Sequence, residues 1–332
     1  MSIPETKLIV KWTEHKKAAS ILAGRMLRIS KNAGLQQEHF ERRALSMGSC
    51  SSRIEVTHCP ECGKLHVSRS WLCRDRLCPV CGWRLSIQRA GEMQQALSYM
   101  RDGGTPLLAA LLTVTQRNVA PEALDNEITS MLSAWKLLTK RRGFSRWIAG
   151  YGRSLEVTYN PNTKTFHPHI HAIIFFKPGY KEKGYIPWEE WREMWRMCMG
   201  LDYDPSVDIR WAYDKATGKA AESWEQITAA AVETFKYSLK PGAALKTSDD
   251  GLYYLAMALK GRRLVSYAGS LRAARAALNI KDTDEPREME ETTLLCSECG
   301  CTELDVAALA WAVKPGAYVL HSLSEHPFSP SG

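Results

Sequence analysis

Three histidines separated by single residues form the densest group of chemically active side chains in the sequence. His167, His169 and His171 lie within five residues, although the whole chain has only nine histidines. Alternation with a period of two places all three imidazoles on one face of a β-strand. We therefore interpret this segment as a metal site, in preference to a set of hydrogen-bonded histidines on a half-exposed strand.

A turn ahead of this strand brings a carboxylate to the histidines. The sequence Asn-Pro-Asn at 160–162 is typical of a turn, so residues 154–159 are predicted to form the other arm of a hairpin. Folding about the turn places Glu156 opposite His169 or His171, because facing side chains on paired strands lie about 5 Å apart. A carboxylate beside two or three imidazoles can bind a divalent cation. The hairpin is therefore a candidate metal centre.

A predicted helix at 222–240 carries a second reactive pattern. Glu233 and Tyr237 are four residues apart and project from one helix face, which Lys236 and Lys240 flank. Beside a divalent metal, a tyrosine can attack a DNA phosphodiester, form a covalent phosphotyrosine and release a 3′-hydroxyl. A nearby glutamate can accept a proton or activate water. A helical tyrosine is more often a core residue, but the glutamate, the lysines and the preceding histidine hairpin favour catalysis.

The cysteines are spaced as metal ligands. The sequence has two C-P-x-C-G motifs, whose cysteine pairs are separated by residues 63–77, and each turns tightly enough to aim two thiolates at one ion. The predicted zinc ligands are Cys59, Cys62, Cys78 and Cys81, with Cys50, Cys73, His58 and His66 as spare candidates. Four thiolates leave no open position, so this zinc is expected to be structural. A further motif near the C-terminus is either a second zinc site or a set of free thiols, with Cys296, Cys299, Cys301 and His321 as its candidate ligands.

Composition favours nucleic acid as the partner. The net charge is +8, and basic residues cluster among eleven tryptophans and twelve tyrosines, which can stack on bases while cations hold phosphates. Arg74 and Arg76, near the cysteine motifs, are candidate DNA contacts. The sequence has neither an apolar run near the roughly 18 residues of a membrane span nor the pattern of a secretory signal. We expect a cytoplasmic protein with no membrane partner.

The predicted elements suggest an α+β protein. Strands at 105–115, 155–159 and 207–211, the histidine strand, and helices at 122–139 and 188–199 follow a split βαβ order, with an antiparallel sheet covered by helices on one face. We predict four segments: an N-terminal helical segment (1–50), a zinc-binding, DNA-contacting module (51–102), a nuclease domain (103–245), and a C-terminal helical region (246–332) with a disordered tail. The acidic run at 281–291 is expected to be a solvated linker.

These motifs resemble those of the HUH endonucleases, and specifically the plasmid rolling-circle replication initiators. The match rests on the histidine strand and the downstream Glu233-Thr234-Phe235-Lys236-Tyr237, while residues 111–115 resemble the family's first motif. The resemblance implies that His169 and His171 hold Mg²⁺ or Mn²⁺, that Tyr237 is the nucleophile, and that Glu233 helps water to close the replication cycle. The third metal ligand varies in the family, so hairpin geometry makes Glu156 our expectation, with His167 as its rival.

The resemblance also implies a function. Such an enzyme nicks single-stranded or hairpin DNA at a plasmid origin, forms a 5′-phosphotyrosine link, and works with host helicase and polymerase, which extends the free 3′ end. Two alternatives remain open at this point: an HUH transposase, and a zinc-stabilised DNA-binding regulator without catalysis. The glutamate four residues before Tyr237 favours the initiator, because a two-tyrosine enzyme carries a second tyrosine on that face.

Overall fold

The computed structural model describes residues 7–105, 108–212, 221, 223–235, 241–287, 289–290, 296 and 298–324. The chain divides into two compact units, one made of Met1–Arg84 with Glu285–Gly332 and the other of Leu85–Asp284. This division differs from the four predicted segments. The two ends of the chain fold together, and the unit that contains the histidines extends beyond 103–245 on both sides.

The unit formed by the chain ends combines helices with an antiparallel sheet. Its elements are α1 (Lys7–Ser30), a 3₁₀ turn (Gly34–Gln36), α2 (Gln37–Ser49), β1 (Arg53–His58), β2 (Leu65–Ser70), β8 (Met289–Glu290), β9 (Asp305–Ala312) and β10 (Ala317–Ser324), and it holds the start of α3 (Pro79–Asp102). The strand order is β10-β9-β1-β2-β8. The C-terminal region was predicted to be helical with a disordered tail, but it also contributes strands to this sheet, in which β9 buries Ala307, Ala308 and Leu309.

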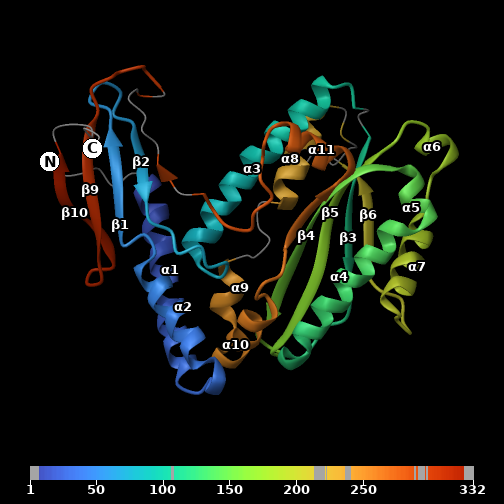
Figure 1. Ribbon diagram of the computed structural model, residues 1–332, viewed down its shortest axis with the longest axis horizontal. Coiled ribbons are helices and arrows are strands. Elements are labelled where there is room, and N and C mark those ends of the chain that lie inside the picture. Colours follow the sequence, from blue (N-terminus) through green and yellow to red (C-terminus); the bar gives the residue numbers. More distant parts are fainter. Residues whose placement is uncertain are drawn as a thin grey trace. The chain divides into compact units, whose positions relative to one another are not determined.

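The second unit contains the predicted metal hairpin in another antiparallel sheet (Figure 1). After Leu85 in α3, its elements are β3 (Ala109–Thr115), a 3₁₀ turn (Pro121–Ala123), α4 (Leu124–Lys140), α5 (Arg142–Trp147), β4 (Ile148–Asn160), β5 (Thr165–Phe176), α6 (Tyr180–Lys183), α7 (Trp188–Met199), β6 (Val207–Trp211), α8 (Trp224–Phe235), α9 (Pro241–Lys246), α10 (Asp249–Ala258), β7 (Val265–Ala268) and α11 (Gly269–Ala277). The strand order is β6-β3-β5-β4-β7.

The register of this sheet confirms the predicted hairpin. Strands β4 and β5 pair so that Glu156 faces His169 and Ser154 faces His171. Along the first half of β5 partly exposed and buried residues alternate, whereas the residues from Ala172 to Phe176 are all buried. The histidines therefore share one face, and the apolar end of the strand is covered on both faces.

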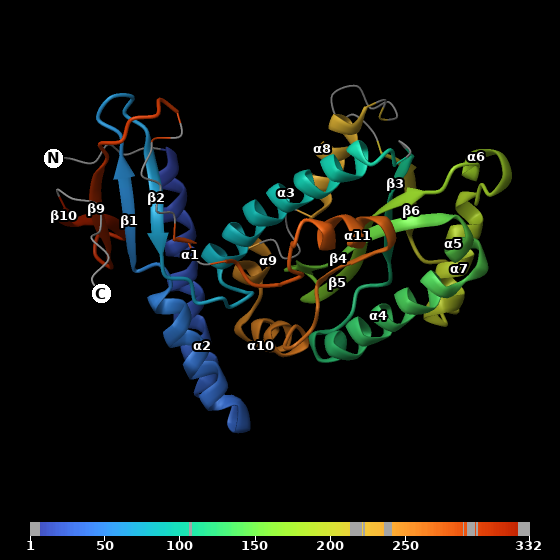
Figure 2. The same ribbon diagram turned by 45° about the horizontal axis from the view of Figure 1, so that its top comes forward.

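Helices cover both faces of the sheet, not one face as predicted (Figure 2). On the face that carries the histidines, Ile173 and Phe175 pack in one apolar cluster with residues of α3, α8 and α11. On the opposite face, Trp135 of α4 meets Tyr151 edge to face at 5.4 Å, and Trp195 of α7 donates to the Thr115 carbonyl at 2.9 Å. The continuous apolar run in β5 requires this two-sided cover. Among the described residues, no helix is long and apolar enough to cross a membrane.

Two acidic residues of the run at 281–291, which was expected to be a solvated linker, pair with buried arginines. Arg275 is buried, and its guanidinium contacts Glu92 at 3.1 Å and Asp282 at 3.0 Å. Asp284 pairs with Arg89 at 2.5 Å and accepts the Leu264 backbone N–H at 2.9 Å. Asp282 and Asp284 are thus structural partners of buried arginines.

Gly152 permits α8 to lie close to the sheet. A Cβ atom at this position would lie 2.8 Å from Cζ of Phe235 in α8 and 3.1 Å from side-chain atoms of Leu271 and Tyr267. We expect Gly152→Ala to lower the free energy of unfolding by about 1–3 kcal/mol, because overpacking forces neighbours to shift. Urea denaturation measures this change. Gly91→Ala, at a helical position with open space, is the control and should stabilise the chain slightly; equal effects would contradict the packing argument.

Candidate metal centre

A carboxylate and two imidazoles converge at the centre of the β4–β5 hairpin. The Oε2 atom of Glu156 lies 3.1 Å from Nε2 of His169 and 3.1 Å from Nε2 of His171. One ligand atom from each residue lies within 4.8 Å of the others. The Glu156 side chain is 6% exposed, that of His169 12% and that of His171 30%, so the group opens toward solvent on the His171 side.

This group fits a divalent cation. Ligand atoms about 2.1 Å from an octahedral ion lie about 3 Å apart at neighbouring positions, which matches the two 3.1 Å separations. One carboxylate with two imidazoles is a donor set suited to Mn²⁺, or to Mg²⁺ with added water, and three protein ligands leave open positions for substrate. The geometry therefore supports Glu156, His169 and His171 as the ligand set.

Hydrogen bonds at Nδ1 of His169 and His171 leave Nε2 of each ring available to bind a metal. Nδ1 of His169 lies 3.1 Å from the backbone carbonyl of His167, and Nδ1 of His171 lies 2.9 Å from Oγ1 of Thr113. Each Nδ1–H can donate to that oxygen, which leaves the Nε2 lone pair free to bind a cation. Thr113, which contacts a candidate metal ligand, was not assigned from the sequence, although it lies in the segment that resembles the first motif of the HUH endonucleases.

His167, the rival third ligand, lies outside the group. Its Nδ1 atom is 2.7 Å from Oδ1 of Asn118, and burial, followed by the neighbouring His169, lowers the pKa of its ring. The geometry thus favours Glu156 over His167.

A hollow beside His171 connects the histidine strand with α8. It has a volume of about 150 Å³, and Thr113, His171, Asp208, Arg210 and Thr234 are among its lining residues. Thr234 belongs to α8, so the helix that carries Glu233 borders the same space as a candidate metal ligand. The hollow gives a substrate group access to this side of the centre.

The structure describes only part of the predicted catalytic and DNA-binding set. Glu233 is an exposed residue of α8, whereas Tyr237, Lys236 and Lys240 lie outside the described residues. In the other unit, Arg74 is exposed and Arg76 is partly buried. Their DNA contacts remain predictions.

The cysteines are grouped differently from the prediction. Cys78 and Cys81 lie with Cys50 and Cys73, whereas Cys59 and Cys62 lie with Cys296 and Cys299. The expectation that the first two motifs share one ion is therefore wrong. The first motif is the turn between β1 and β2, while the second lies at the start of α3. Of the remaining candidates, Cys301 donates to the Glu303 carbonyl and His321 is exposed in β10.

Thr113→Val tests whether the hydrogen bond to Thr113 positions the ring of His171. The change keeps the side-chain shape but removes the acceptor for Nδ1–H, so we expect Mn²⁺ to bind about tenfold more weakly. Titration followed by Mn²⁺ electron paramagnetic resonance measures this affinity directly. Thr115→Val is the matched control, because Oγ1 of Thr115 donates to the Ser206 carbonyl. Unchanged affinity in Thr113→Val would contradict the positioning role.

Comparison with known proteins identifies the family. The replication protein family model matches residues 64–319. A Protein rep from Bacillus amyloliquefaciens is 31% identical over 290 residues, which cover 82% of this chain and 83% of that protein. A Protein rep from a Bacillus species is 32% identical over 264 residues, covering 74% and 84%, and one from Lentilactobacillus hilgardii is 32% identical over 229 residues, covering 67% and 71%. No solved structure matches the chain.

The chain belongs to the replication protein family, since the family model covers most of its length. This membership confirms the resemblance to plasmid replication initiators that the motifs indicated.

Proposed function

We propose that the protein initiates plasmid rolling-circle replication by nicking origin DNA with a metal-assisted tyrosine nucleophile. The observation that carries the proposal is the convergence of Glu156, His169 and His171 on a sheet face bordered by α8, in a chain of the replication protein family. Family membership favours an initiator over the transposase alternative. A cytoplasmic location follows from plasmid DNA as the substrate.

The proposed chemistry uses ligands of the β4–β5 hairpin together with Glu233 and Tyr237. The phenolate oxygen of Tyr237 attacks the scissile phosphorus, and the bond to the 3′ oxygen breaks. The products are a 5′-phosphotyrosine and a 3′-hydroxyl that host polymerase extends. Glu156, His169 and His171 would hold a divalent cation, which would supply positive charge to stabilise the charge that develops on the phosphate. Glu233 takes a proton from water or from the 3′-hydroxyl in the later cleavage or joining step.

The neighbours of Glu233 in α8 place this residue close to the candidate metal centre. Thr234, the next residue of α8, lines the hollow that His171 also lines. Phe235 anchors the same turn of the helix, because it is fully buried and packs beside Tyr267 with ring centroids 5.8 Å apart. Phe235 thus fixes the end of α8 near the candidate metal centre. In the sequence that follows, Lys236 and Lys240 are residue types that suit phosphate groups.

A nicking assay on the protein's own replicon tests the function. Supercoiled plasmid and single-stranded oligonucleotides from the replicon are incubated with the full chain in Mg²⁺, in Mn²⁺ and in a chelator. We expect a nick at one origin position, dependent on metal and followed by rejoining. Tight binding without cleavage at any position would contradict the enzyme and favour a DNA-binding regulator, whereas joining to unrelated DNA would favour a transposase.

A further inference from the structure

Eight of the ten cysteines form two compact groups within the unit built from the chain ends. We propose that each group is a closed structural zinc site with four thiolate ligands, so that the chain binds two zinc ions independently of its histidine centre. The first group is Cys50, Cys73, Cys78 and Cys81, and the second is Cys59, Cys62, Cys296 and Cys299. The proposal does not depend on the nicking reaction.

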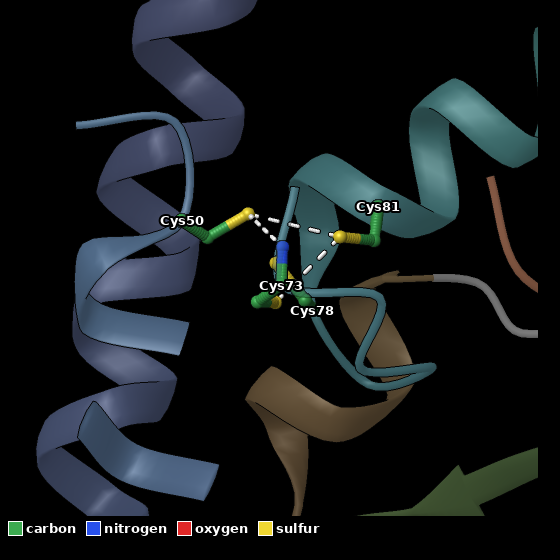
Figure 3. Close-up of side chains that lie close together, drawn as sticks. All are labelled: Cys50, Cys73, Cys78 and Cys81. Carbon is green, nitrogen blue, oxygen red and sulfur yellow. Dashed lines mark hydrogen bonds between the residues drawn. The ribbon is translucent and has the colours of Figure 1, made fainter. Parts of the chain in front are cut away.

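The first group lies between the end of α2 and the start of α3. Cys50 follows α2, Cys81 lies in the first turn of α3, and the four sulfur atoms turn toward one another (Figure 3). Sγ of Cys81 is 3.7 Å from Sγ of Cys50 and 3.6 Å from Sγ of Cys73. Sulfurs about 2.3 Å from a tetrahedral zinc ion lie about 3.8 Å apart. Disulfide sulfurs lie only about 2.05 Å apart, so the spacing fits a metal shell.

A buried lysine complements the charge of the first group. Lys16 is fully buried, and its ammonium donates to the carbonyls of Gly48 and Cys50, each at 2.7 Å, and to Oγ of Ser52 at 3.0 Å. Burial lowers the pKa of Lys16, and the nearby cysteine thiolates, that of Cys50 first, raise it. A buried ammonium needs a counter-charge. Zinc with four thiolates carries net negative charge and supplies one.

The second group is built from two turns of the same geometry. In each C-x-x-C-G turn the glycine has a positive φ, 69° at Gly63 and 76° at Gly300. In each, the glycine N–H donates at 2.9 Å to the carbonyl of the first cysteine, Cys59 or Cys296. Left-handed glycines let each turn close around its two thiols. Two matched turns that face each other are the arrangement by which paired knuckles enclose one zinc ion.

The sulfur atoms of the second group lie between the two turns. Sγ of Cys59 is 3.5 Å from Sγ of Cys299, and Sγ of Cys62 is 3.5 Å from Sγ of Cys296. Backbone N–H groups, that of Cys62 first, lower the pKa of Cys59 to about 6. Backbone N–H groups, that of Cys299 first, also lower the pKa of Cys296. At the first cysteine of each turn, backbone N–H groups thus favour the thiolate, the form that binds zinc.

The second ion would hold the two chain ends together. Strand β9 pairs with β1 so that Asp305 faces His58, which brings the C-terminal turn beside the β1–β2 turn. A zinc ion there would connect Cys62 to Cys296 across a separation of 234 residues. Because zinc binding to such a site contributes directly to folding, this ion should stabilise β9 and β10 on the N-terminal sheet.

Zinc stoichiometry of the full chain tests the proposal. Elemental analysis is made in a His169→Ala, His171→Ala background, so that metal at the histidine centre does not add to the count. We expect two zinc ions per chain, one after Cys73→Ser, one after Cys299→Ser and none after both changes. Cys301→Ser is the matched control and should retain both ions. After cobalt substitution, the protein with all its cysteines should show thiolate-to-metal charge-transfer bands. Their intensity per chain should be twice that of the bands in either single cysteine variant.

The parent protein decides the result even if a variant fails to fold. One zinc ion per chain, or none, in the unaltered cysteine background would overturn the proposal. Loss of the same single ion from Cys62→Ser and from Cys78→Ser, with Cys73→Ser silent, would instead support one shared site of Cys59, Cys62, Cys78 and Cys81. Two ions lost separately by Cys73→Ser and Cys299→Ser would establish the two sites.

Discussion

Replacing Glu156 with glutamine is expected to slow metal-dependent nicking by about a thousandfold, since loss of about 4 kcal/mol of transition-state stabilisation has that effect. The Oε2 atom of Glu156 is 3.1 Å from the Nε2 atoms of both histidines, so it is the ligand atom that joins the group. Glutamine preserves the size of the side chain and removes its charge. Single-turnover cleavage of an origin oligonucleotide measures the rate, and Mn²⁺ titration measures the accompanying loss of affinity.

His167→Ala is the control for the first prediction. His167 is on the same strand face but contacts Asn118 at 2.7 Å and lies outside the Glu156 group. It should retain most of the nicking rate. A thousandfold loss in His167→Ala with a mild effect in Glu156→Gln would show that His167 is the third ligand and that Glu156 is not.

Arg275→Met is expected to lower the free energy of unfolding by about 3–5 kcal/mol, the usual cost of removing one partner from a buried ion pair. Arg275 is 3% exposed and contacts Glu92, which is 6% exposed, as well as Asp282. Its guanidinium also lies 4.0 Å from the ring centroid of Tyr267. Methionine keeps much of the volume but removes the guanidinium that contacts the buried Glu92 carboxylate. The midpoint of urea denaturation measures the change.

Two further variants isolate the cause of that change. Adding Glu92→Gln to Arg275→Met should restore part of the stability, because the buried carboxylate that has lost this guanidinium is then replaced by a neutral group and the two effects are not additive. Arg101→Ala removes an arginine from an exposed pair with Asp102, and it should have little effect on the midpoint. Equal losses in Arg275→Met and Arg101→Ala would contradict a role for burial.

The metal hairpin could be predicted from the sequence because its determinants are local. Alternation placed the histidines on one face, and the turn at 160–162 placed Glu156 opposite His169 or His171, of which the observed register selects His169. Helix α7 also matched its prediction, Trp188–Met199, because proline precedes it and glycine follows it. Where neighbours in the sequence determine the local structure, residue pattern and spacing are sufficient to predict it.

Contacts between distant parts of the chain could not be predicted in the same way. Cys59 and Cys78 carry the same motif, and nothing in their spacing reveals that Cys59 lies with a cysteine 240 residues away. That pairing depends on β9 joining β1, a choice made by sheet packing. Strand β7, with four residues, was also missed, because its pairing with β4 decides its conformation.

Mapping the covalent DNA adduct tests the central claim most directly. The full chain is incubated with Mn²⁺ and a labelled origin oligonucleotide, then digested with protease and nuclease, and the modified peptide is identified by mass spectrometry. We expect a nucleotide attached to Tyr237, with no adduct in Tyr237→Phe and none in His169→Ala. An adduct on another tyrosine, or one that persists in Tyr237→Phe, would contradict the assigned nucleophile; cleavage without any adduct would contradict the phosphotyrosine mechanism.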